Sequence, residues 1–220
     1  MENFNKNITF VIVTYKSESV IEQCLKKIPN KSKIIIVDNS NDFILKKKIK
    51  LKFPKVKFLL NKKNVGYGKA NNIGILNVNT KYAFILNPDA ILKKKTIIEL
   101  KKAAHVLSNK FSIISPNLDN NYGYFENRNK VNIGNNLLDV DYVKGFAMLL
   151  NLERVNKKKI FDENFFLFLE EIDFCKRIKN LGEKIYIVKK SRITHAGKSS
   201  SKDSIKIELC RNWHWMWSLF

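Results

Sequence analysis

In the stretch "YAFILNPDAIL", residues 82–92, an apolar run ends at a polar turn. Its first five residues are apolar or aromatic, and the run stops at Asn87 and Pro88, which is typical of a buried β-strand that ends at a turn. Asp89 follows the proline directly. Ligands of open α/β sheets bind beyond the carboxyl ends of the strands. The stretch therefore predicts a core strand with a carboxylate at the ligand-binding edge of a sheet.

Apolar, β-branched runs recur on both sides of this strand. Helix-like segments separate the early runs, and the first of them is predicted from Ser19 and Glu22 as a capping box. Strands that alternate with helices indicate an α/β fold with a largely parallel sheet flanked by helices. The predicted strands are residues 8–13, 33–37, 56–60, 82–86, 112–115, 146–150 and 185–188.

The rest of the chain predicts no second domain. Residues 117–141 are rich in Asn, Gly and Asp and are interpreted as a long loop. We find no internal repeat and no low-complexity linker, so residues 1–220 are expected to form one domain. Residues 203–220 carry all three tryptophans and are predicted to begin a C-terminal helix, whose abrupt end suggests that related proteins continue further.

Composition limits the class of protein. A chain of 220 residues with 45% hydrophobic residues can bury a sizeable core. Three widely spaced cysteines predict neither a disulfide framework nor a zinc site. No segment is long enough to span a bilayer and no signal peptide is recognised, so we predict a soluble, cytoplasmic protein.

The net charge of +21 favours an anionic partner. Phosphate-bearing ligands, an acidic membrane surface and nucleic acid all fit it, and charge alone does not choose among them. Because the aromatic residues lie mostly in core-like runs and are not interleaved with the basic clusters, stacking platforms for nucleic acid are not evident. We therefore predict no nucleic-acid partner, and a noncatalytic nucleic-acid-binding protein is kept as the alternative from another class.

The glycine stretch "NVGYGKANNIG", residues 64–74, follows a strand and opens a helix. It contains Gly66 and Gly68 but lacks the third glycine of a dinucleotide-binding fingerprint. Two interpretations remain open for it. The glycines either let the backbone approach a ligand or meet the torsional demands of a tight turn.

A helix is predicted from Glu170 within "FDENFFLFLEEIDFCKRIKNLG", residues 161–182. Helical spacing places Glu171 in the apolar face and Glu170 on the polar edge, where Arg177 can pair with Asp173. At the first turn of a helix, the N-terminal dipole favours a charged carboxylate whereas burial raises its pKa. Glu171 is therefore either a general base or a buried acid paired with a lysine.

His195 lies in "ITHAGKSSS", residues 193–201, just after the last predicted strand. A single histidine fits a structural, hydrogen-bonded role as well as a ligand role. The residues alone do not decide between the two.

Taken in order, seven motifs resemble the family 2 glycosyltransferases, especially the bacterial branch that contains rhamnosyltransferases. The resemblance runs from about residue 8 to about residue 212. It implies a GT-A fold, with a Rossmann-like sheet that binds a nucleotide-diphosphate sugar and a divalent cation, Mn²⁺ or Mg²⁺. The motifs are "VIVTYKSE", "IIIVDNS", "NVGYGKANNIGI", "FILNPDAIL", "VKGFAMLL", "FDENFFLFLEEIDFCKRIKNLG" and "ITHAGKSSS".

The resemblance also implies roles for individual residues. The segment from Asn87 to Asp89 matches the family's D-x-D position, with asparagine in place of the first acid, so Asp89 is expected to hold the metal bound to the donor diphosphate. His195 matches a histidine that completes that metal site. The remaining positions matched to nucleotide-sugar binding are Thr14, Tyr15 and Asp38 for the base and ribose, and Gly66 and Asn71 near the diphosphate.

Glu170 and Glu171 match the first two acids of the family's E-D-x-D motif, whose second acid is the usual general base. Glu171 is one methylene longer than the expected aspartate, so Glu170 is kept as the fallback. The resemblance implies an inverting hexosyltransferase that moves a sugar from a dTDP or UDP donor to a hydroxyl of a surface glycan or a lipid-linked acceptor.

Other interpretations of the chain remain. A degenerate relative would bind the donor without transfer, and a nucleotidyltransferase would need a glycine- and arginine-rich phosphate loop that "VTYKSESV" lacks. The basic surface also predicts peripheral contact with the anionic inner face of the cytoplasmic membrane, because each lysine near such a surface adds about 1 kcal/mol of attraction.

Overall fold

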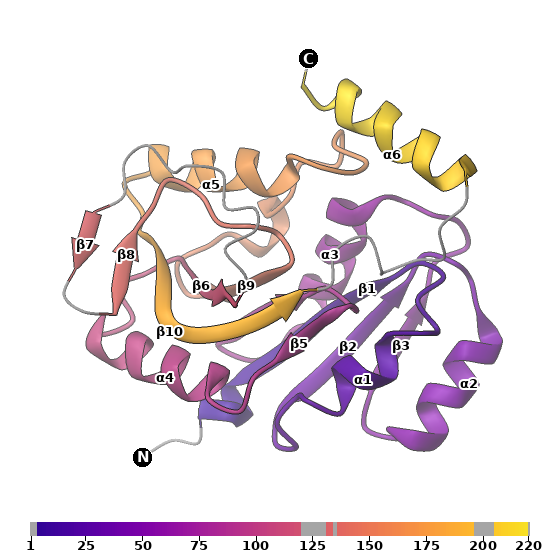
Figure 1. Ribbon diagram of the computed structural model, residues 1–220, viewed down its shortest axis with the longest axis horizontal. Coiled ribbons are helices and arrows are strands. Elements are labelled where there is room, and N and C mark those ends of the chain that lie inside the picture. Colours follow the sequence, from indigo (N-terminus) through magenta and orange to yellow (C-terminus); the bar gives the residue numbers. More distant parts are fainter. Residues whose placement is uncertain (1–3, 120–130, 134–135, 196–204, 220) are drawn as a thin grey trace.

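The computed structural model describes residues 4–119, 131–133, 136–195 and 205–219 (Figure 1). Within these ranges one sheet runs through the molecule in the order β3-β2-β1-β4-β9-β6-β10-β8-β7, and β5 pairs with β10. The strands are β1 (Ile8–Thr14), β2 (Lys33–Asp38), β3 (Lys57–Leu60), β4 (Tyr82–Leu86), β5 (Ala90–Leu92), β6 (Ile113–Leu118), β7 (Val131–Ile133), β8 (Leu137–Asp139), β9 (Ala147–Asn151) and β10 (Ile185–His195). The helices are η1 (Phe4–Asn7), α1 (Ile21–Leu25), α2 (Phe43–Lys52), α3 (Tyr67–Leu76), α4 (Thr96–Val106), η2 (Lys157–Lys159), α5 (Glu170–Asn180) and α6 (Ile205–Trp217).

The sheet has a parallel half and a mixed half. Strands β3, β2, β1 and β4 are parallel neighbours, whereas β9 runs antiparallel to both β4 and β6. All seven predicted strands are confirmed. Strands β5, β7 and β8 were not predicted, because each has only three residues and so too few positions for a periodic pattern.

Two hydrophobic layers hold the helices on the sheet. Every residue of β1 is buried, and its side chains alternate between the two faces. Phe10 and Ile12 pack with α1, α2 and α4 on one face, whereas Val11 and Val13 pack with α3 and α5 on the other. Full burial of such a side chain contributes about 1.5–3 kcal/mol, so β1 anchors the fold from both sides.

The predicted capping box of the first helix is wrong. Helix α1 begins after Val20, and no side chain among the described residues caps its N-terminus. Instead, the carbonyl oxygen of Ser17 accepts hydrogen bonds from the backbone N–H groups of Val20 and Ile21. Glu22 forms ion pairs with Lys48 and Lys52 of α2 at 3.0 and 2.7 Å, and these lysines compete for its carboxylate.

The loop predicted at residues 117–141 needs correction where the structure describes it. Strand β6 continues to Leu118, and β7 and β8 pair as an antiparallel hairpin whose second strand joins β10. Residues 120–130 and 134–135 of the predicted loop lie outside the described residues. The hairpin escaped prediction because its strands are short and surrounded by asparagines.

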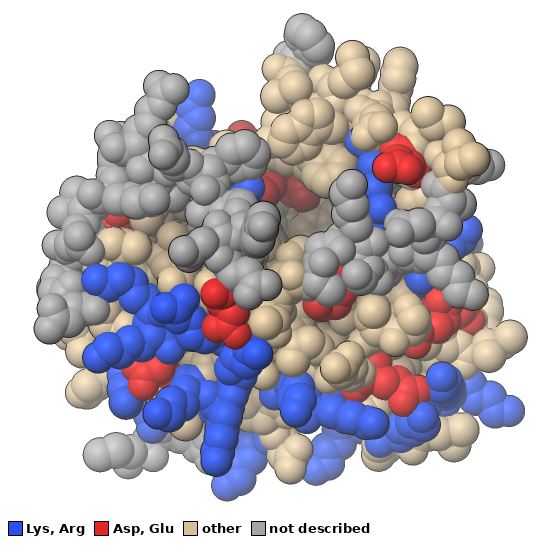
Figure 2. All heavy atoms as spheres, viewed as in Figure 1, with Lys and Arg blue, Asp and Glu red and all other residues tan. Residues whose placement is uncertain are grey.

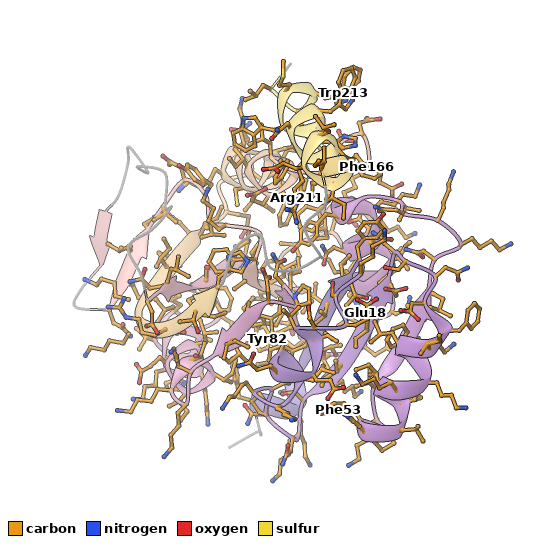
Figure 3. All side chains as sticks on the ribbon, turned by 45° about the vertical axis from the view of Figure 1, so that its right-hand side comes forward. Glu18, Phe53, Tyr82, Phe166, Arg211 and Trp213 are labelled. Carbon is orange, nitrogen blue, oxygen red and sulfur yellow. The ribbon has the colours of Figure 1, made fainter. Side chains whose placement is uncertain are left out.

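Helix α6 lies above the end of the sheet at which β1 stops, and its two faces differ (Figures 1 and 3). The inner face contacts the loop before α5: the His214 ring stacks on Phe166 at 4.3 Å and Ser218 donates a hydrogen bond to the Leu167 carbonyl oxygen at 3.0 Å. Figure 3 shows Trp213 on the outer side, pointing away from the sheet. The exposed apolar side chains of the outer face are Ile205, Leu209, Trp213, Met216 and Trp217. Among the described helices, none has the length and apolar character that crossing a membrane requires.

Candidate functional site

A cavity of about 630 Å³ opens at the carboxyl edge of the sheet, beneath α6. Figure 3 shows Phe166 and Arg211 below α6, between this helix and the rest of the domain. The cavity is of the size that small-molecule ligands occupy. Its walls come from the ends of β1, β2, β4 and β10, the start of α3, the loop before α5, and α6. The lining residues on which the argument below depends are Tyr15, Asn39, Gly66, Tyr67, Asn87, Asp89, Phe166, His195 and Arg211.

The structure brings about half of the predicted site residues to this cavity. Tyr15, Gly66, Asn87, Asp89 and His195 line it. The predicted residues that do not line it are Thr14, Asp38, Asn71, Glu170 and Glu171. Asn71 is completely buried in α3, where its side chain donates a hydrogen bond to the Tyr67 carbonyl oxygen at 3.0 Å.

Asp89 and His195 form a close pair in the cavity wall. Strand β5 pairs with β10 so that Ala90 lies opposite His195, and this register brings Asp89 beside the histidine. Asp89 is 4% exposed, and its Oδ1 lies 3.2 Å from His195 Nε2. Phe146 stacks on the histidine ring with 4.5 Å between the ring centres. The pair is therefore held by the sheet and not by a mobile loop.

The Asp89 carboxylate has the surroundings of a cation ligand. Neither of its oxygens accepts a hydrogen bond from a described residue. A buried carboxylate without donors is costly unless a cation compensates it, and carboxylate oxygen and imidazole nitrogen suit Mn²⁺. The described part of the chain contains no group of three or more His, Cys, Asp or Glu residues that could hold a metal. Asp89 and His195 therefore fit a cation that takes its other ligands from bound substrate or water.

Thr14 and Asp38 shape the cavity from behind its wall. Both are completely buried, and the Thr14 hydroxyl donates to Asp38 Oδ1 at 2.7 Å. The other carboxylate oxygen accepts from the backbone N–H groups of Ser40 and Asp42. This network fixes the turn after β2, and the neighbouring Asn39 reaches the cavity instead.

Gly66 meets a steric demand at the start of α3. Its φ of +88° lies in the left-handed region, and a Cβ atom there would overlap the carbonyl oxygen of Phe166. The same carbonyl oxygen accepts a hydrogen bond from the backbone N–H of Tyr67 at 2.8 Å. The torsional interpretation of the glycine stretch is therefore confirmed at Gly66, and the approach to a ligand stays a prediction at a residue that lines the cavity.

Gly66→Ala tests this close approach. Gly182→Ala is the matched control, because Gly182 also has a positive φ of +75° but has no atom within 4 Å of the added Cβ. We expect Gly66→Ala to lower the free energy of unfolding by about 1–3 kcal/mol more than the control does, since it adds overpacking to the same torsional strain. Urea unfolding of both variants measures the difference. Equal losses would contradict the packing described here.

Glu170 and Glu171 begin α5 in unusual surroundings. Leu169, which precedes them, has a left-handed φ of +67°. Glu170 is 3% exposed, and burial, reinforced by the charge of Glu171, raises its pKa to about 8. Burial also raises the pKa of the half-buried Glu171, although backbone hydrogen bonds and the charge of Lys144 oppose this rise.

The predicted faces of α5 are partly wrong. Helical spacing placed Glu171 on the apolar face, but Glu170 is the more deeply buried of the two. Leu181, which was expected on that apolar face, is 77% exposed. The pairing of Arg177 with Asp173 is confirmed, at 2.8 Å.

Glu170 makes stability depend on pH. The folded protein keeps this proton up to about pH 8, whereas an unfolded glutamate loses it near pH 4.5. The folded state therefore binds more protons between these values, and its stability falls as the pH rises through this window. We expect Glu170→Gln, which has no proton to lose, to gain stability relative to wild type as the pH rises from about 4.5 to 8. Urea unfolding across the window checks this, and a constant difference would contradict it.

The sequence analysis missed the contribution of α6 to the cavity. Its inner face brings Ile207 and Arg211 into the wall, and His214 contacts the loop that forms the same wall. These three residues follow one another at intervals of four and three, which is the spacing of one helix face. That spacing could have indicated the contact, but the tryptophans at 213, 215 and 217 also suggested an apolar helix face.

The mixed α/β sheet, parallel in one half and covered by helices on both faces, has the GT-A class of fold. The chain matches the family described as "Glycosyl transferase family 2" over residues 9–173, and it belongs to this family. A curated relative is the low-salt glycan biosynthesis hexosyltransferase Agl10 of Haloferax volcanii. It is 28% identical over 201 residues, which are 80% of this chain and 64% of the relative.

Solved structures confirm the fold. GalNAc-T7 with UDP, GalNAc and Mn²⁺ has a TM-score of 0.69 at 16% identity, over 86% of this chain and 43% of its own. S. aureus TarS 1–349 with UDP-GlcNAc has a TM-score of 0.66 at 17% identity, over 90% of this chain and 61% of its own. The mannosyltransferase PcManGT of Pyrobaculum calidifontis with GDP-Man and Mn²⁺ has a TM-score of 0.66 at 13% identity, over 86% and 56%. This chain spans less than two thirds of the length of each of these relatives.

Proposed function

We propose that residues 1–220 form the donor-binding and catalytic domain of an inverting glycosyltransferase that depends on a divalent cation. The observation that carries this proposal is the buried Asp89 carboxylate, which lines the cavity 3.2 Å from His195 Nε2 and accepts no hydrogen bond from the residues that the structure describes. Membership of family 2 supports it. The rhamnosyltransferase-like branch stays a prediction.

The donor is proposed to be a nucleotide-diphosphate sugar. Tyr15 and Asn39 at the strand ends would face the nucleoside, and Gly66 at the start of α3 would lie near the diphosphate. Asp89 and His195 would hold Mn²⁺ or Mg²⁺, which neutralises charge on the departing nucleoside diphosphate. A dTDP or UDP donor is our proposal for the nucleotide, and the solved relatives have UDP, UDP-GlcNAc or GDP-Man bound.

Glu171 is proposed as the general base. It would take the proton of an acceptor hydroxyl while the acceptor oxygen forms a bond to the anomeric carbon and the bond from that carbon to the diphosphate oxygen breaks. A single displacement inverts the anomeric centre and needs no protein nucleophile. Glu170 is the less suitable base, because its deep burial keeps its proton bound up to about pH 8.

The proposal is tested by donor turnover. The protein is incubated with Mn²⁺ and with UDP-, dTDP- and GDP-sugars, with and without a hydroxyl-rich glycan acceptor, and released nucleoside diphosphate is measured. We expect release from one nucleotide class, accelerated by the acceptor and abolished by a chelator. Donor binding without release would favour the degenerate alternative, and absence of both would refute the proposal.

Contact with an anionic membrane is a second part of the proposal. Lys and Arg side chains gather along the lower part of Figure 2, where Figure 1 places α4, α1 and α2, away from α6. Helix α2 alone carries five lysines, Lys46, Lys47, Lys48, Lys50 and Lys52. The cavity lies at the opposite end of the domain, beneath α6, so this contact would leave its residues uncovered.

We expect the protein to sediment with vesicles that contain phosphatidylserine and to be released as salt is raised, because screening weakens attraction between exposed charges. Vesicles of phosphatidylcholine alone are the matched control and should leave it in the supernatant. Equal sedimentation with both kinds of vesicle would contradict an electrostatic contact.

A further inference from the structure

Tyr67 lies between the two parts of the candidate site, which are the Asp89–His195 pair and Glu171. It is the first residue of α3 and lines the cavity. Its hydroxyl lies 2.8 Å from Asn87 Oδ1 and 2.9 Å from the carbonyl oxygen of Gly145. Both partners are acceptors, so the one hydroxyl hydrogen is shared between them. The hydroxyl thereby joins two segments that lie 20 and 78 residues away in the sequence.

The first contact leads to the proposed metal ligands. Asn87 follows β4, and its backbone N–H donates to the Phe146 carbonyl oxygen at 2.9 Å. Its side-chain Nδ2 lies 3.4 Å from His195 Nε2, the nitrogen that is also 3.2 Å from Asp89 Oδ1. The amide of Asn87 is therefore fixed by Tyr67 at one end and faces His195 at the other.

The second contact leads to the proposed base. The backbone N–H of Gly145 forms a hydrogen bond with Glu171, and this bond lowers the pKa of Glu171 against the effect of burial. A Cβ atom at Gly145 would lie 3.4 Å from the Cβ of Glu171, so the two residues are in direct contact. Any movement of Gly145 would therefore move a hydrogen-bond donor of Glu171.

We propose that Tyr67 is a positioning residue that holds the Asp89–His195 pair and Glu171 at a fixed separation from each other. This inference rests on the proposed function. Displacement of reacting groups by about 1 Å can lower an enzymatic rate by about 10²-fold. A hydroxyl that ties both halves together thus affects metal binding and transfer, although it acts through its neighbours.

Tyr67→Phe removes the hydroxyl and keeps the ring. At saturating Mn²⁺ and donor we expect kcat to fall by about tenfold or more, with the KM of the donor changed by less than about threefold. The affinity for Mn²⁺ in the presence of UDP, followed by the electron paramagnetic resonance signal of free Mn²⁺, should weaken severalfold. This binding measurement does not depend on transfer.

Tyr82→Phe is the matched control. The Tyr82 hydroxyl also donates to an asparagine, Asn109, but Tyr82 does not line the cavity. We expect it to lower the melting temperature while leaving kcat and Mn²⁺ affinity unchanged. Wild-type kcat and Mn²⁺ affinity in Tyr67→Phe would overturn the positioning role alone. A wild-type protein that neither binds Mn²⁺ with UDP nor transfers sugar would instead contradict the proposed function.

The same contact is tested from its other end by Asn87→Ala. If Tyr67 acts through Asn87, the double variant should weaken Mn²⁺ affinity no more than the stronger single variant does, because effects of residues in contact are not additive. Effects that multiply would overturn the proposal. Should Tyr67→Phe fail to fold, unchanged Mn²⁺ affinity in Asn87→Ala would overturn it as well.

Discussion

Glu171→Gln should lower the transfer rate by about 10²–10⁴-fold, the contribution of a positioned general base. Glutamine keeps the shape of the side chain but cannot accept the acceptor's proton. Nucleotide affinity should stay near that of wild type, because Glu171 does not line the cavity. Steady-state kinetics with saturating donor and acceptor measure the rate. Glu171→Asp, which restores the usual acid of the family, should keep a substantial part of the activity.

The control for this prediction is Asp173→Asn. Asp173 lies in the same first turn of α5 and forms an ion pair with Arg177 at 2.8 Å, and this ion pair is partly exposed. Such pairs contribute about 0–1 kcal/mol to stability, so the variant should transfer sugar at nearly the wild-type rate. A wild-type rate in Glu171→Gln would rule out its role as base. Strong loss in Asp173→Asn would point to the polar edge of α5 instead.

Asp89→Asn should abolish the effect of Mn²⁺ on nucleotide binding and lower transfer by about 10²–10³-fold, the usual effect of removing one electrostatic stabiliser. The substitution leaves the volume of the side chain unchanged and removes its charge. Titration calorimetry with UDP, with and without Mn²⁺, measures the first effect.

Asp139→Asn is the matched control for the loss of a buried charge. Asp139 pairs with Lys179 and Lys184, both at 3.0 Å, and does not line the cavity. Its neutralisation should lower stability and leave the effect of Mn²⁺ intact. If Asp89→Asn kept the full effect of Mn²⁺ on UDP affinity, the assigned metal ligand would be incorrect.

The strands could be predicted because short runs of apolar, β-branched residues that end at turn residues are typical of buried strands. The run before Asn87 and the six others all formed strands. The antiparallel placement of β9 between β4 and β6 could not be predicted, because strand order depends on contacts that are distant in the sequence. The capping box predicted for α1 was wrong because it also depends on a distant contact. Glu22 forms ion pairs with lysines of α2.

The candidate site was predicted in part. Asp89 and His195 were matched by motif order, and their 3.2 Å contact depends on the register of β5 and β10, which no local pattern contains. Helical spacing predicted Glu171 as the more buried of the two glutamates, but Glu170 is the more buried one. Helical spacing says which residues share a face, but the left-handed Phe168 and Leu169 set how the first turn of α5 meets the core.

The most direct test of the account is the melting temperature with UDP, dTDP and GDP, each with and without Mn²⁺, for wild type and for Asp89→Asn. Ligands that bind only the folded state raise its apparent stability. We predict an increase for one nucleotide that requires Mn²⁺ in the wild type and is absent in Asp89→Asn. An unchanged melting temperature with all three nucleotides, or an increase that needs neither Mn²⁺ nor Asp89, would contradict a cation-dependent donor site.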